Sequence, residues 1–532
     1  MSDRFHFRFA AAAFAALTAA VPVVAASCDS LSNLKLPNTT ITLAQVVAAG
    51  EFTPPPPTGP VFGPRGEPVN WKELPAFCRV AATIHPVADS EIKMEVWLPL
   101  SDSASSWNNE FEADGNAGWT GSINYNSLGA ALRRGFVAAM TDTGHEGGRA
   151  SFALDHPEKV IDFGYRAVHE LTVQSKAIIE AFYGRAPRLA LWNGCSAGGR
   201  EGLKEAQMFP DDYDGIVAGA PINDFVGRSL AGVWMAQAVH RDAASAIPVE
   251  KFAVIHKAVV EACDAMDGVK DGVIENPALC KFDPQTIACK DGNSNACLTP
   301  AEVEAVKKIY SGVINSETKQ LVFPGLVPGS ELGWATQAGP RPFTAATDYF
   351  KYIVFKNPDW DYKTLNFAGD ITLAEKADHG TINATNPDVR AFFRRGGKIL
   401  QYQGWSDQQM SGANSPKYYD SVVSEIGDAS TVGKSYRLFM VPGMGHCGGG
   451  EGANTFDKLG TLETWLKTGN PPDRIIASRI EAGKVVRTHP LCPYPETAVY
   501  NGSGSTDDAA NFTCRVSSSL SAKRPNGSPA AR

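Results

Sequence analysis

The chain has 532 residues, of which 43% are hydrophobic and 20% are charged, a composition typical of a globular protein with a large core. Its 49 basic and 57 acidic side chains give a net charge of −8 without any basic run. This excludes a protein that binds nucleic acid through a basic patch, so no nucleic-acid partner is expected. The length predicts several domains, or one domain with a large insertion.

The N-terminus has the pattern of a secretory signal peptide. Arg4, His6 and Arg8 precede an apolar run over residues 9–24, and small residues at 24–26 offer a cleavage site. We therefore predict a signal peptide over residues 1–26 and a mature protein that is secreted or periplasmic. The alternative is a membrane anchor, because the run is nearly long enough to span a bilayer. No other run of that length occurs, so no membrane span is expected in the mature chain.

Residues 27–221 alternate predicted strands and helices, which is the pattern of an α/β fold. Strands are expected at residues 92–98, 136–140, 189–192 and 215–219. In the first of these, apolar residues at every second position predict a strand that is buried on one face only. Apolar residues at helical spacing over residues 168–182, followed by Gly184, predict a helix with a glycine C-cap.

The alternation of strands and helices stops over residues 222–387, where helical segments, Cys-bounded loops and aromatic-rich stretches replace it. We predict an inserted domain there. Strands expected at residues 398–402 and 436–441 restore the α/β pattern over residues 388–532. The Ser-, Ala- and Asn-rich tail from Ser505 onward is expected to be flexible, with Cys514 holding part of it.

The pentapeptide from Gly194 to Gly198 has the sequence Gly-Cys-Ser-Ala-Gly. It follows the predicted strand at 189–192 and precedes a stretch with helical character. A strand, a tight turn with two glycines and a helix form the nucleophile elbow of serine hydrolases, which exposes the hydroxyl of the central serine, here Ser196. The alternative is an ordinary loop rich in glycine and serine.

Two more polar sites follow predicted strands, Asp407 and His446. A serine hydroxyl needs a base to take its proton, and the base needs an acid that fixes its tautomer and stabilises the imidazolium. The chain order of Ser196, Asp407 and His446 is that of α/β-hydrolases. The alternative for Asp407 is a helix cap.

Cysteines lie directly beside two members of this predicted triad. Cys195 precedes the serine and Cys447 follows the histidine, so a formed triad would bring them close enough for a disulfide. The alternative is two unrelated buried thiols. The total of ten cysteines is even and includes no Cys-x-x-Cys pair, which is typical of disulfides in an exported protein.

A glycine-rich loop over residues 114–121 comes after the early strand predicted at residues 92–98. Such a loop can present backbone N–H groups to an anion, which in a serine hydrolase is the tetrahedral oxyanion. The alternative is a surface turn.

Three segments together resemble the tannase/feruloyl esterase family of secreted α/β-hydrolases. They are Gly-Cys-Ser-Ala-Gly-Gly-Arg from Gly194, Gly-Trp-Ser-Asp from Gly404, and Val-Pro-Gly-Met-Gly-His-Cys-Gly-Gly-Gly from Val441. The resemblance runs from about Cys28 to Cys514. It implies an α/β-hydrolase fold with a large inserted lid domain that carries most of the substrate specificity.

The resemblance also implies roles for single residues. Ser196 would be the nucleophile, His446 the base and Asp407 the acid, with a disulfide beside the triad. The oxyanion hole would use the backbone N–H groups of Ala197 and Gly115, with Gly118 as the alternative to Gly115. Two further positions would line the acyl pocket: Gln403, where many members have His, and Met410.

Three carboxylates lie on a glycine-rich loop of the predicted insertion, at Asp264, Asp267 and Asp271. Closely spaced carboxylates repel one another unless a hard cation joins them, although a solvated acidic turn is the alternative. The family has a similar loop that binds calcium. The resemblance implies these three carboxylates and the carbonyls of Val269 and Val273 as ligands of a structural Ca²⁺, and no organic cofactor is expected.

The remaining cysteines are paired by proximity in the sequence. We predict bridges Cys28–Cys78, Cys263–Cys280, Cys289–Cys297 and Cys492–Cys514, besides Cys195–Cys447.

These features together predict a secreted serine carboxylesterase. Its expected substrates are small aromatic esters or feruloylated or galloylated plant-derived material, with a hydroxycinnamate such as ferulate as the acyl group. A tannase that cleaves galloyl esters and a hydrolase of terephthalate monoesters are close alternatives. A serine peptidase and a non-catalytic secreted binder are more remote ones.

Overall fold

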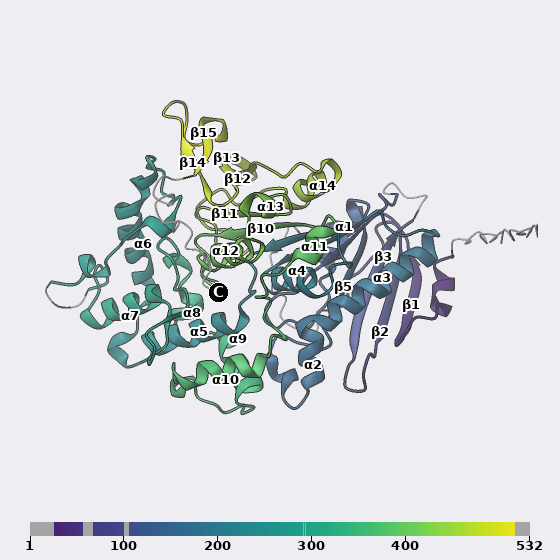
Figure 1. Cartoon of the computed structure of the whole chain (residues 1–532), viewed down its shortest axis with the longest axis horizontal. Helices are drawn as coiled ribbons and strands as arrows, with labels where there is room; N and C mark the ends of the chain where they lie inside the picture. The colour runs from purple at the N-terminus through teal and green to yellow at the C-terminus, as the bar shows by residue number, and fades with distance from the viewer. Residues whose placement is uncertain (1–25, 57–67, 101–105, 291, 293, 517–532) are drawn as a thin grey trace, which may run out of the picture.

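The computed structural model describes residues 26–56, 68–100, 106–290, 292 and 294–516. All but the last residue of the predicted signal peptide lies outside this part of the chain. The centre of the fold is a nine-stranded sheet in the order β1-β2-β3-β5-β4-β6-β7-β10-β11 (Figure 1). Its strands are β1 (Thr39–Val47), β2 (Phe77–Ile84), β3 (Ile92–Pro99), β4 (Glu110–Asp114), β5 (Val137–Thr141), β6 (Leu189–Cys195), β7 (Gly215–Gly219), β10 (Lys398–Gly404) and β11 (Tyr436–Val441).

The sheet changes from antiparallel to parallel along its width. Strands β1, β2, β3 and β5 pair antiparallel, whereas every pair from β5 to β11 is parallel. Because parallel strands need helical crossovers, helices accompany this part of the sheet. They are α1 (Tyr125–Arg133), α2 (Pro157–Ile161), α3 (Ala167–Tyr183), α4 (Ala197–Met208), α11 (Arg390–Arg394), α12 (Asn414–Ile426), α13 (Ala429–Val432) and α14 (Lys458–Thr468).

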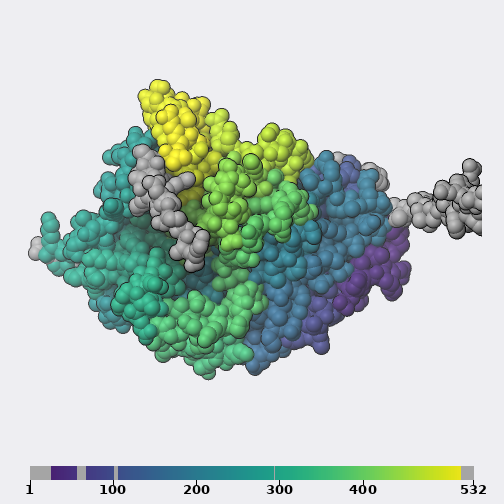
Figure 2. All heavy atoms as spheres, in the orientation of Figure 1, coloured from purple at the N-terminus to yellow at the C-terminus, as the bar shows by residue number. Residues whose placement is uncertain are grey.

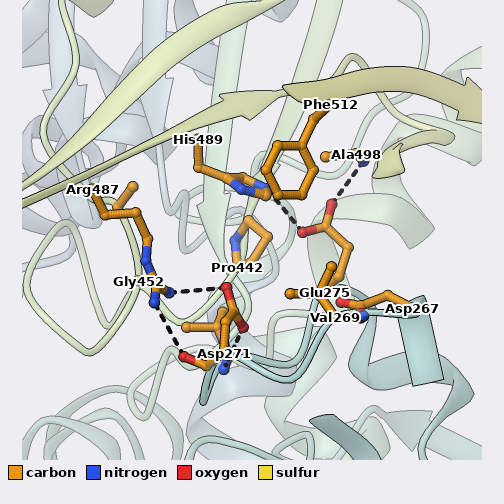
Figure 3. A pocket seen from close by; sticks show the side chains of 12 residues that line it. Asp267, Val269, Asp271, Glu275, Pro442, Gly452, Arg487, His489, Ala498 and Phe512 are labelled. Carbon is orange, nitrogen blue, oxygen red and sulfur yellow. Dashed lines mark hydrogen bonds and ion pairs between the residues drawn. The ribbon is translucent and has the colours of Figure 1, made fainter. Parts of the chain in front are cut away.

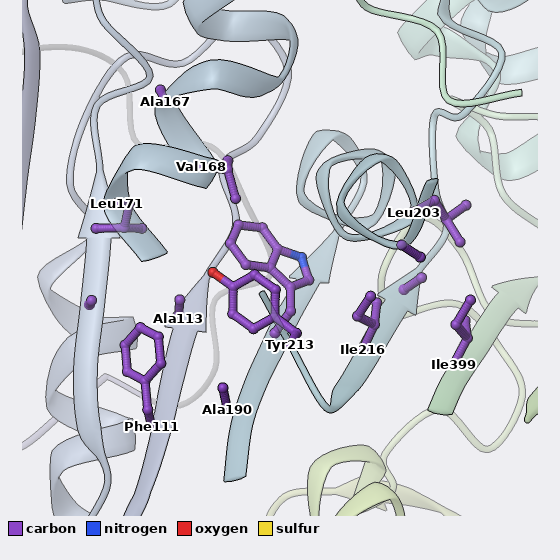
Figure 4. Close-up of a cluster of buried hydrophobic side chains, with 14 of the residues drawn as sticks. Phe111, Ala113, Ala167, Val168, Leu171, Ala190, Leu203, Tyr213, Ile216 and Ile399 are labelled. Carbon is purple, nitrogen blue, oxygen red and sulfur yellow. The ribbon is translucent and has the colours of Figure 1, made fainter. Parts of the chain in front are cut away.

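Two hydrophobic cores show that helices cover both faces of the sheet. One core joins the sheet to α3, α4 and α12, and the other joins it to α1 and α14. Figure 4 shows the first core, where Val168 and Leu171 of α3 and Leu203 of α4 lie over Phe111 and Ile216 of the strands. Helix α3 ends at Tyr183 and is capped by Gly184, whose φ of 70° suits glycine, as its sequence pattern predicts. The arrangement confirms the predicted α/β fold.

Strand β3 differs from the prediction of one exposed face. All of its residues except Lys93 are buried. Glu95 is tolerated inside because Arg79 pairs with it at 2.5 Å and the Trp97 indole donates to it at 2.9 Å. The strand lies between β2 and β5, and the buried ion pair allows it to be covered on both faces.

The chain leaves the large sheet after β7 and returns at β10. Between them lie residues 222–387, here called the inserted region, which appear in teal and green in Figures 1 and 2. They form most of another hydrophobic core, to which Trp119, Phe163 and Met410 from outside this range also belong. The two domain boundaries stay predictions. The inserted region contains α5 (Phe225–Val239), α6 (Val249–Cys263), α7 (Pro300–Ser311), β8 (Val313–Ile314), β9 (Leu321–Phe323), α8 (Ala335–Ala338), α9 (Thr344–Asp348) and α10 (Gly369–Asp378).

Two hairpins follow α14. They pair β12 (Ile475–Glu481) with β13 (Lys484–Leu491) and β14 (Glu496–Tyr500) with β15 (Phe512–Val516). The tail predicted to be flexible from Ser505 is therefore ordered as far as residue 516, because β15 pairs with β14 and Cys514 is bonded to Cys492. The residues after 516 lie outside the described part. No helix among the described residues has the length and apolar character needed to cross a membrane.

All five predicted disulfides are confirmed, and no described cysteine is free. They are Cys28–Cys78, Cys195–Cys447, Cys263–Cys280, Cys289–Cys297 and Cys492–Cys514.

Candidate active site

Ser196 occupies a sharp turn between β6 and α4. Its φ of 66° and ψ of −121° are unusual for a residue with a side chain, which is the strained geometry of a nucleophile elbow. The flanking glycines are required by space: a Cβ at Gly194 would lie 2.3 Å from the carbonyl oxygen of Gly198. The turn predicted from the pentapeptide is therefore present.

The structure brings Ser196, His446 and Asp407 into one hydrogen-bonded chain. His446 Nε2 lies 2.8 Å from Ser196 Oγ, and His446 Nδ1 lies 2.7 Å from Asp407 Oδ2. Since a carboxylate only accepts, Nδ1 carries the proton and Nε2 is left to accept from the serine hydroxyl. The side chains follow β6, β10 and β11, whose carboxyl ends meet at one edge of the sheet.

The carboxylate of Asp407 is fully buried and held by further donors. Oδ1 accepts from the backbone N–H groups of Gln409 at 2.8 Å and Met410 at 3.0 Å, and Oδ2 accepts from Gln403 Nε2 at 2.9 Å as well as from His446. Its acceptor positions are thus filled, which fixes the orientation of the histidine ring.

These contacts correct the prediction that Gln403 and Met410 line the acyl pocket. Both side chains are completely buried, and neither borders the cavity at Ser196. Gln403 instead lies behind Asp407, where its Oε1 accepts from the Ser415 hydroxyl at 3.0 Å. Met410 packs in the core of the inserted region, and its backbone holds the acid.

The predicted oxyanion donor Gly115 is also corrected. Its N–H donates to the carbonyl of Asn193 at 3.1 Å and is therefore occupied. Gly115 is needed for another reason, since a Cβ there would lie 2.4 Å from Cα of Gly198. The next amide, that of Asn116, donates to Glu201 Oε2 at 3.0 Å.

Near Ser196, the backbone N–H groups of Ala197, Ala117 and Gly118 have no acceptor within the described residues. Ala197 begins α4, where the first N–H groups of a helix lack partners and carry a partial positive charge. Ala117 and Gly118 line the cavity together with Ser196. The geometry thus keeps Ala197 and Gly118 as oxyanion candidates and adds Ala117.

A cavity of about 800 Å³ opens over the triad. Its wall combines the glycine-rich loop of the sheet domain with the inserted region, which contributes Arg228 and Phe343. Trp119 and Phe343 give it aromatic surface, a feature that suits an aromatic ligand. The described lining includes three arginines, namely Arg149, Arg228 and Arg341, and no carboxylate. Burial lowers the pKa of Arg228 to about 9, although the charge of Asp407 opposes this.

The loop predicted to bind calcium lies next to the C-terminal hairpins (Figure 3). Four of the five predicted ligands, Asp267, Val269, Asp271 and Val273, line a cavity of about 20 Å³, together with Glu275. Asp264 lies behind, where its carboxylate accepts the N–H groups of Asp271 and Gly272.

The residues at this loop fit a calcium ion. Carboxylate and carbonyl oxygens are the donors that Ca²⁺ prefers, and the cavity has room for one small ion. Arg487 pairs with Asp271 at 3.0 Å and His489 with Glu275 at 3.0 Å, which leaves the Asp267 carboxylate without a cationic partner in the described structure. Whether calcium binds stays a prediction.

His169, Glu205 and Asp212 are the other described cluster with metal-ligating atoms, all within 4.8 Å of one another. His169 Nδ1 lies 2.7 Å from Asp212 Oδ2, so this histidine is already paired in the structure. Neither oxygen of Glu205 has a hydrogen-bond donor within the described parts of the chain, and burial and Asp212 raise its pKa well above the ordinary value. A proton held on Glu205 removes the charge repulsion between the two carboxyl groups.

Comparisons with known proteins decide the family. The family model described as "Tannase and feruloyl esterase" matches residues 78–515. The chain belongs to this family. It is therefore a carboxylic ester hydrolase.

Individual relatives agree with that assignment. The chain is 36% identical to an uncharacterized esterase of Xanthomonas campestris, over 92% of this chain and 91% of the relative. It is 32% identical to a probable feruloyl esterase B-1 of Aspergillus oryzae, over 82% and 84%. The crystal structure of feruloyl esterase B from Aspergillus oryzae superposes with a TM-score of 0.84 and 29% identity, over 92% of this chain and 99% of that one.

Sequence patterns missed several residues of these sites. Glu275 joins the acidic loop just beyond the predicted ligands, and the spacing of carboxylates along the loop would have included it. Arg228 and Phe343 belong to no motif, because they reach the cavity only through the folding of the inserted region.

Proposed function

We propose that this protein is a serine esterase that hydrolyses aromatic esters of the hydroxycinnamate type. The observation that carries the proposal is the hydrogen-bonded chain of Ser196, His446 and Asp407 at the base of a large cavity with aromatic walls. The relatives named feruloyl esterases support ferulate as the acyl group. Tannase activity on galloyl esters is the second candidate, since the family includes both.

The geometry supports an acyl-enzyme mechanism. Ser196 Oγ attacks the ester carbonyl while His446 Nε2 takes its proton, and Asp407 stabilises the resulting imidazolium. The oxyanion accepts hydrogen bonds from the Ala197 N–H and from the N–H of Ala117 or Gly118. His446 then gives its proton to the departing alcohol. Water attacks the acyl-enzyme by the same route and releases the acid.

The calcium loop has a structural part in this proposal. Asp264, Asp267 and Asp271, with the carbonyls of Val269 and Val273, would hold Ca²⁺, which would supply charge compensation to the loop and take no part in ester hydrolysis. We expect Ca²⁺ to raise the Tm of chelator-treated protein and Asp267→Asn to abolish that rise. A Tm that calcium does not change in the unaltered protein would contradict the site.

The five disulfides indicate an oxidising compartment. We propose that residues 1–26 direct export and that the mature enzyme is secreted or periplasmic. N-terminal sequencing of protein exported by its host would test the cleavage site after Ala26.

Hydrolysis of methyl ferulate and methyl gallate, measured side by side, tests the function. We expect cleavage of methyl ferulate and loss of at least about 1,000-fold in kcat for Ser196→Ala. Preference for methyl gallate would make the protein a tannase. Full activity of Ser196→Ala would refute the mechanism, whereas cleavage of peptide amides in place of esters would indicate a peptidase. Absence of labelling of Ser196 by a fluorophosphonate would favour a non-catalytic binder.

A further inference from the structure

Arg228 is a buried cation in the wall of the active-site cavity. It lies in the first turn of α5, is 2% exposed, and borders the same cavity as Ser196 and His446. A positive charge in the first turn of a helix is unfavourable, because the N-terminal end of the helix is itself positive. Neither its burial nor its position on the helix therefore favours an arginine.

The guanidinium of Arg228 has no hydrogen-bond acceptor among the described residues. Its Nε and Nη1 atoms are buried without a partner. Its central carbon lies 4.3 Å from the centroid of the Phe343 ring, so the ring covers one face of the group. Guanidinium N–H groups point outward in the plane, so a ring on the face does not block them. Because Nε and Nη1 are fully buried, Nη2 is the nitrogen that a ligand in the cavity can reach.

Asp407 is not the missing partner. Its carboxylate already accepts from four donors, and Arg228 is not among them. Arg149, in the same cavity wall, shows the opposite situation. It forms a bidentate pair with Asp348 at 2.6 and 2.7 Å, so these two donors are already used within the protein. Arg228 is therefore a buried arginine of this wall with its donors unused.

The charged side chains in the described lining of the cavity are all positive. Its described lining holds three arginines without any Asp or Glu, although the whole chain is acidic. With a pKa of about 9, Arg228 keeps its charge at neutral pH. A wall of this kind favours an anionic ligand, and a carboxylate oxygen can accept a charge-assisted hydrogen bond from Nη2 of Arg228.

We propose that Arg228 binds a carboxylate of the substrate, separate from the ester that Ser196 attacks. The inference rests on the proposed esterase function and narrows it to aromatic esters with a second, anionic group. That carboxylate can belong to the acid part of the ester or to its alcohol part.

Two pairs of substrates separate these sources. Mono(2-hydroxyethyl) terephthalate against 2-hydroxyethyl benzoate tests a carboxylate on the acid part, and chlorogenate against methyl caffeate tests one on the alcohol part. We expect the ratio of kcat/KM for the charged ester to that for its neutral analogue to fall about 10- to 100-fold in Arg228→Met in one of the pairs. Arg394→Met, which removes an exposed charge at the end of α11 and away from the cavity lining, is the matched control and should change that ratio by less than about 3-fold.

The stability of the variant provides an independent readout. Because Arg228→Met removes an unpaired buried charge, its Tm should equal or exceed that of the unaltered protein, so lost selectivity would not reflect misfolding. Equal losses on charged and neutral esters, or an unchanged ratio in both pairs, would overturn the proposal. In that case Arg228 would act through the triad or not at all.

A measurement without turnover separates this proposal from the esterase function itself. Benzoate should protect Ser196 of the unaltered protein from a fluorophosphonate better than benzamide does, and this difference should disappear in Arg228→Met. Equal protection by the two compounds, with Ser196 still labelled, would refute the role of Arg228 and leave the esterase intact. Absence of any labelling would refute the esterase.

Discussion

The amide of Gln403 lies behind the catalytic acid and connects it to the next helix. Its Nε2 donates to Asp407 Oδ2, and its Oε1 accepts from Ser415 of α12. Gln403 is thus a positioning residue that never reaches the cavity. A neutral amide in this place supplies a donor to the carboxylate without introducing a second charge beside the triad.

Replacing Gln403 with Leu should slow the reaction without weakening substrate binding. Removal of one donor loosens the Asp407 carboxylate, and we expect kcat on methyl ferulate to fall about 10-fold with KM within about 2-fold. Gln403→His retains a ring N–H and should recover part of the loss. A large rise in KM with an unchanged kcat would instead place Gln403 in the acyl pocket.

At the scale of elements, the Cys195–Cys447 bridge joins the turn after β6 to the loop after β11. It links the nucleophile and the base across a sequence separation of 252 residues. The double variant Cys195→Ser/Cys447→Ser should lose stability, as removal of a native disulfide does by about 2–5 kcal/mol, and also lose kcat.

The matched control is Cys492→Ser/Cys514→Ser, which opens a bridge between the C-terminal hairpins. It should lower the Tm and leave kcat nearly unchanged at temperatures where both variants are folded. Equal kcat values for the two double variants would show that the first bridge does not position the triad.

Glu205, near the C-terminal end of α4, is a buried carboxyl with no hydrogen-bond donor on either oxygen among the described residues. Its raised pKa, caused by burial and then by Asp212, means that folding holds a proton there. This contribution to stability is lost as pH rises through the folded pKa. Glu205→Gln replaces the proton with an amide N–H, so we expect an unchanged or higher Tm at pH 8 and a weaker fall in Tm between pH 6 and 8. A large loss of stability at pH 8 would contradict a proton held on Glu205.

Several elements and contacts were predictable because neighbouring residues determine them. The periodicity of α3, the apolar strands β5, β10 and β11, and the glycine turn at Ser196 depend on local sequence. The identity of the free amides in the oxyanion loop does not depend on local sequence. Gly115 is excluded only because Asn193, from another strand, accepts its N–H. Likewise, the sequence places Gln403 near Asp407 but does not show that its side chain turns away from the cavity.

At the scale of the whole molecule, the inserted region is fixed to the sheet domain by polar contacts around the cavity. The Trp119 indole donates to the carbonyl of Ala345 at 2.9 Å, and Arg149 pairs with Asp348. On another side, His256 of α6 lies 2.9 Å from Glu331 of the inserted region and 2.8 Å from Glu451. Glu451 belongs to the loop that follows His446, so this histidine connects the inserted region to the catalytic loop.

The His256 contacts predict a pH-dependent attachment of the inserted region. Burial lowers the pKa of His256, but the hydrogen bonds and charges of Glu331 and Glu451 outweigh it and raise the pKa to about 9. A histidine whose pKa is higher in the folded state contributes stability that is complete below about pH 6.5 and disappears as pH rises through about 9. His256→Gln should therefore lower the Tm at pH 6 and have little effect at pH 10, as measured by thermal unfolding across this range.

Glu451→Gln tests the attachment of the inserted region to the catalytic loop separately from the stability of the inserted region itself. It leaves the pair of His256 with Glu331 in place and removes only the link to the catalytic loop. If that link holds the base loop, Glu451→Gln should lower kcat at pH 7 and have little effect on it above pH 9, where His256 is neutral in the unaltered protein as well. A Tm difference for His256→Gln that is the same at pH 6 and pH 10 would show that the charge of His256 does not hold the two parts together.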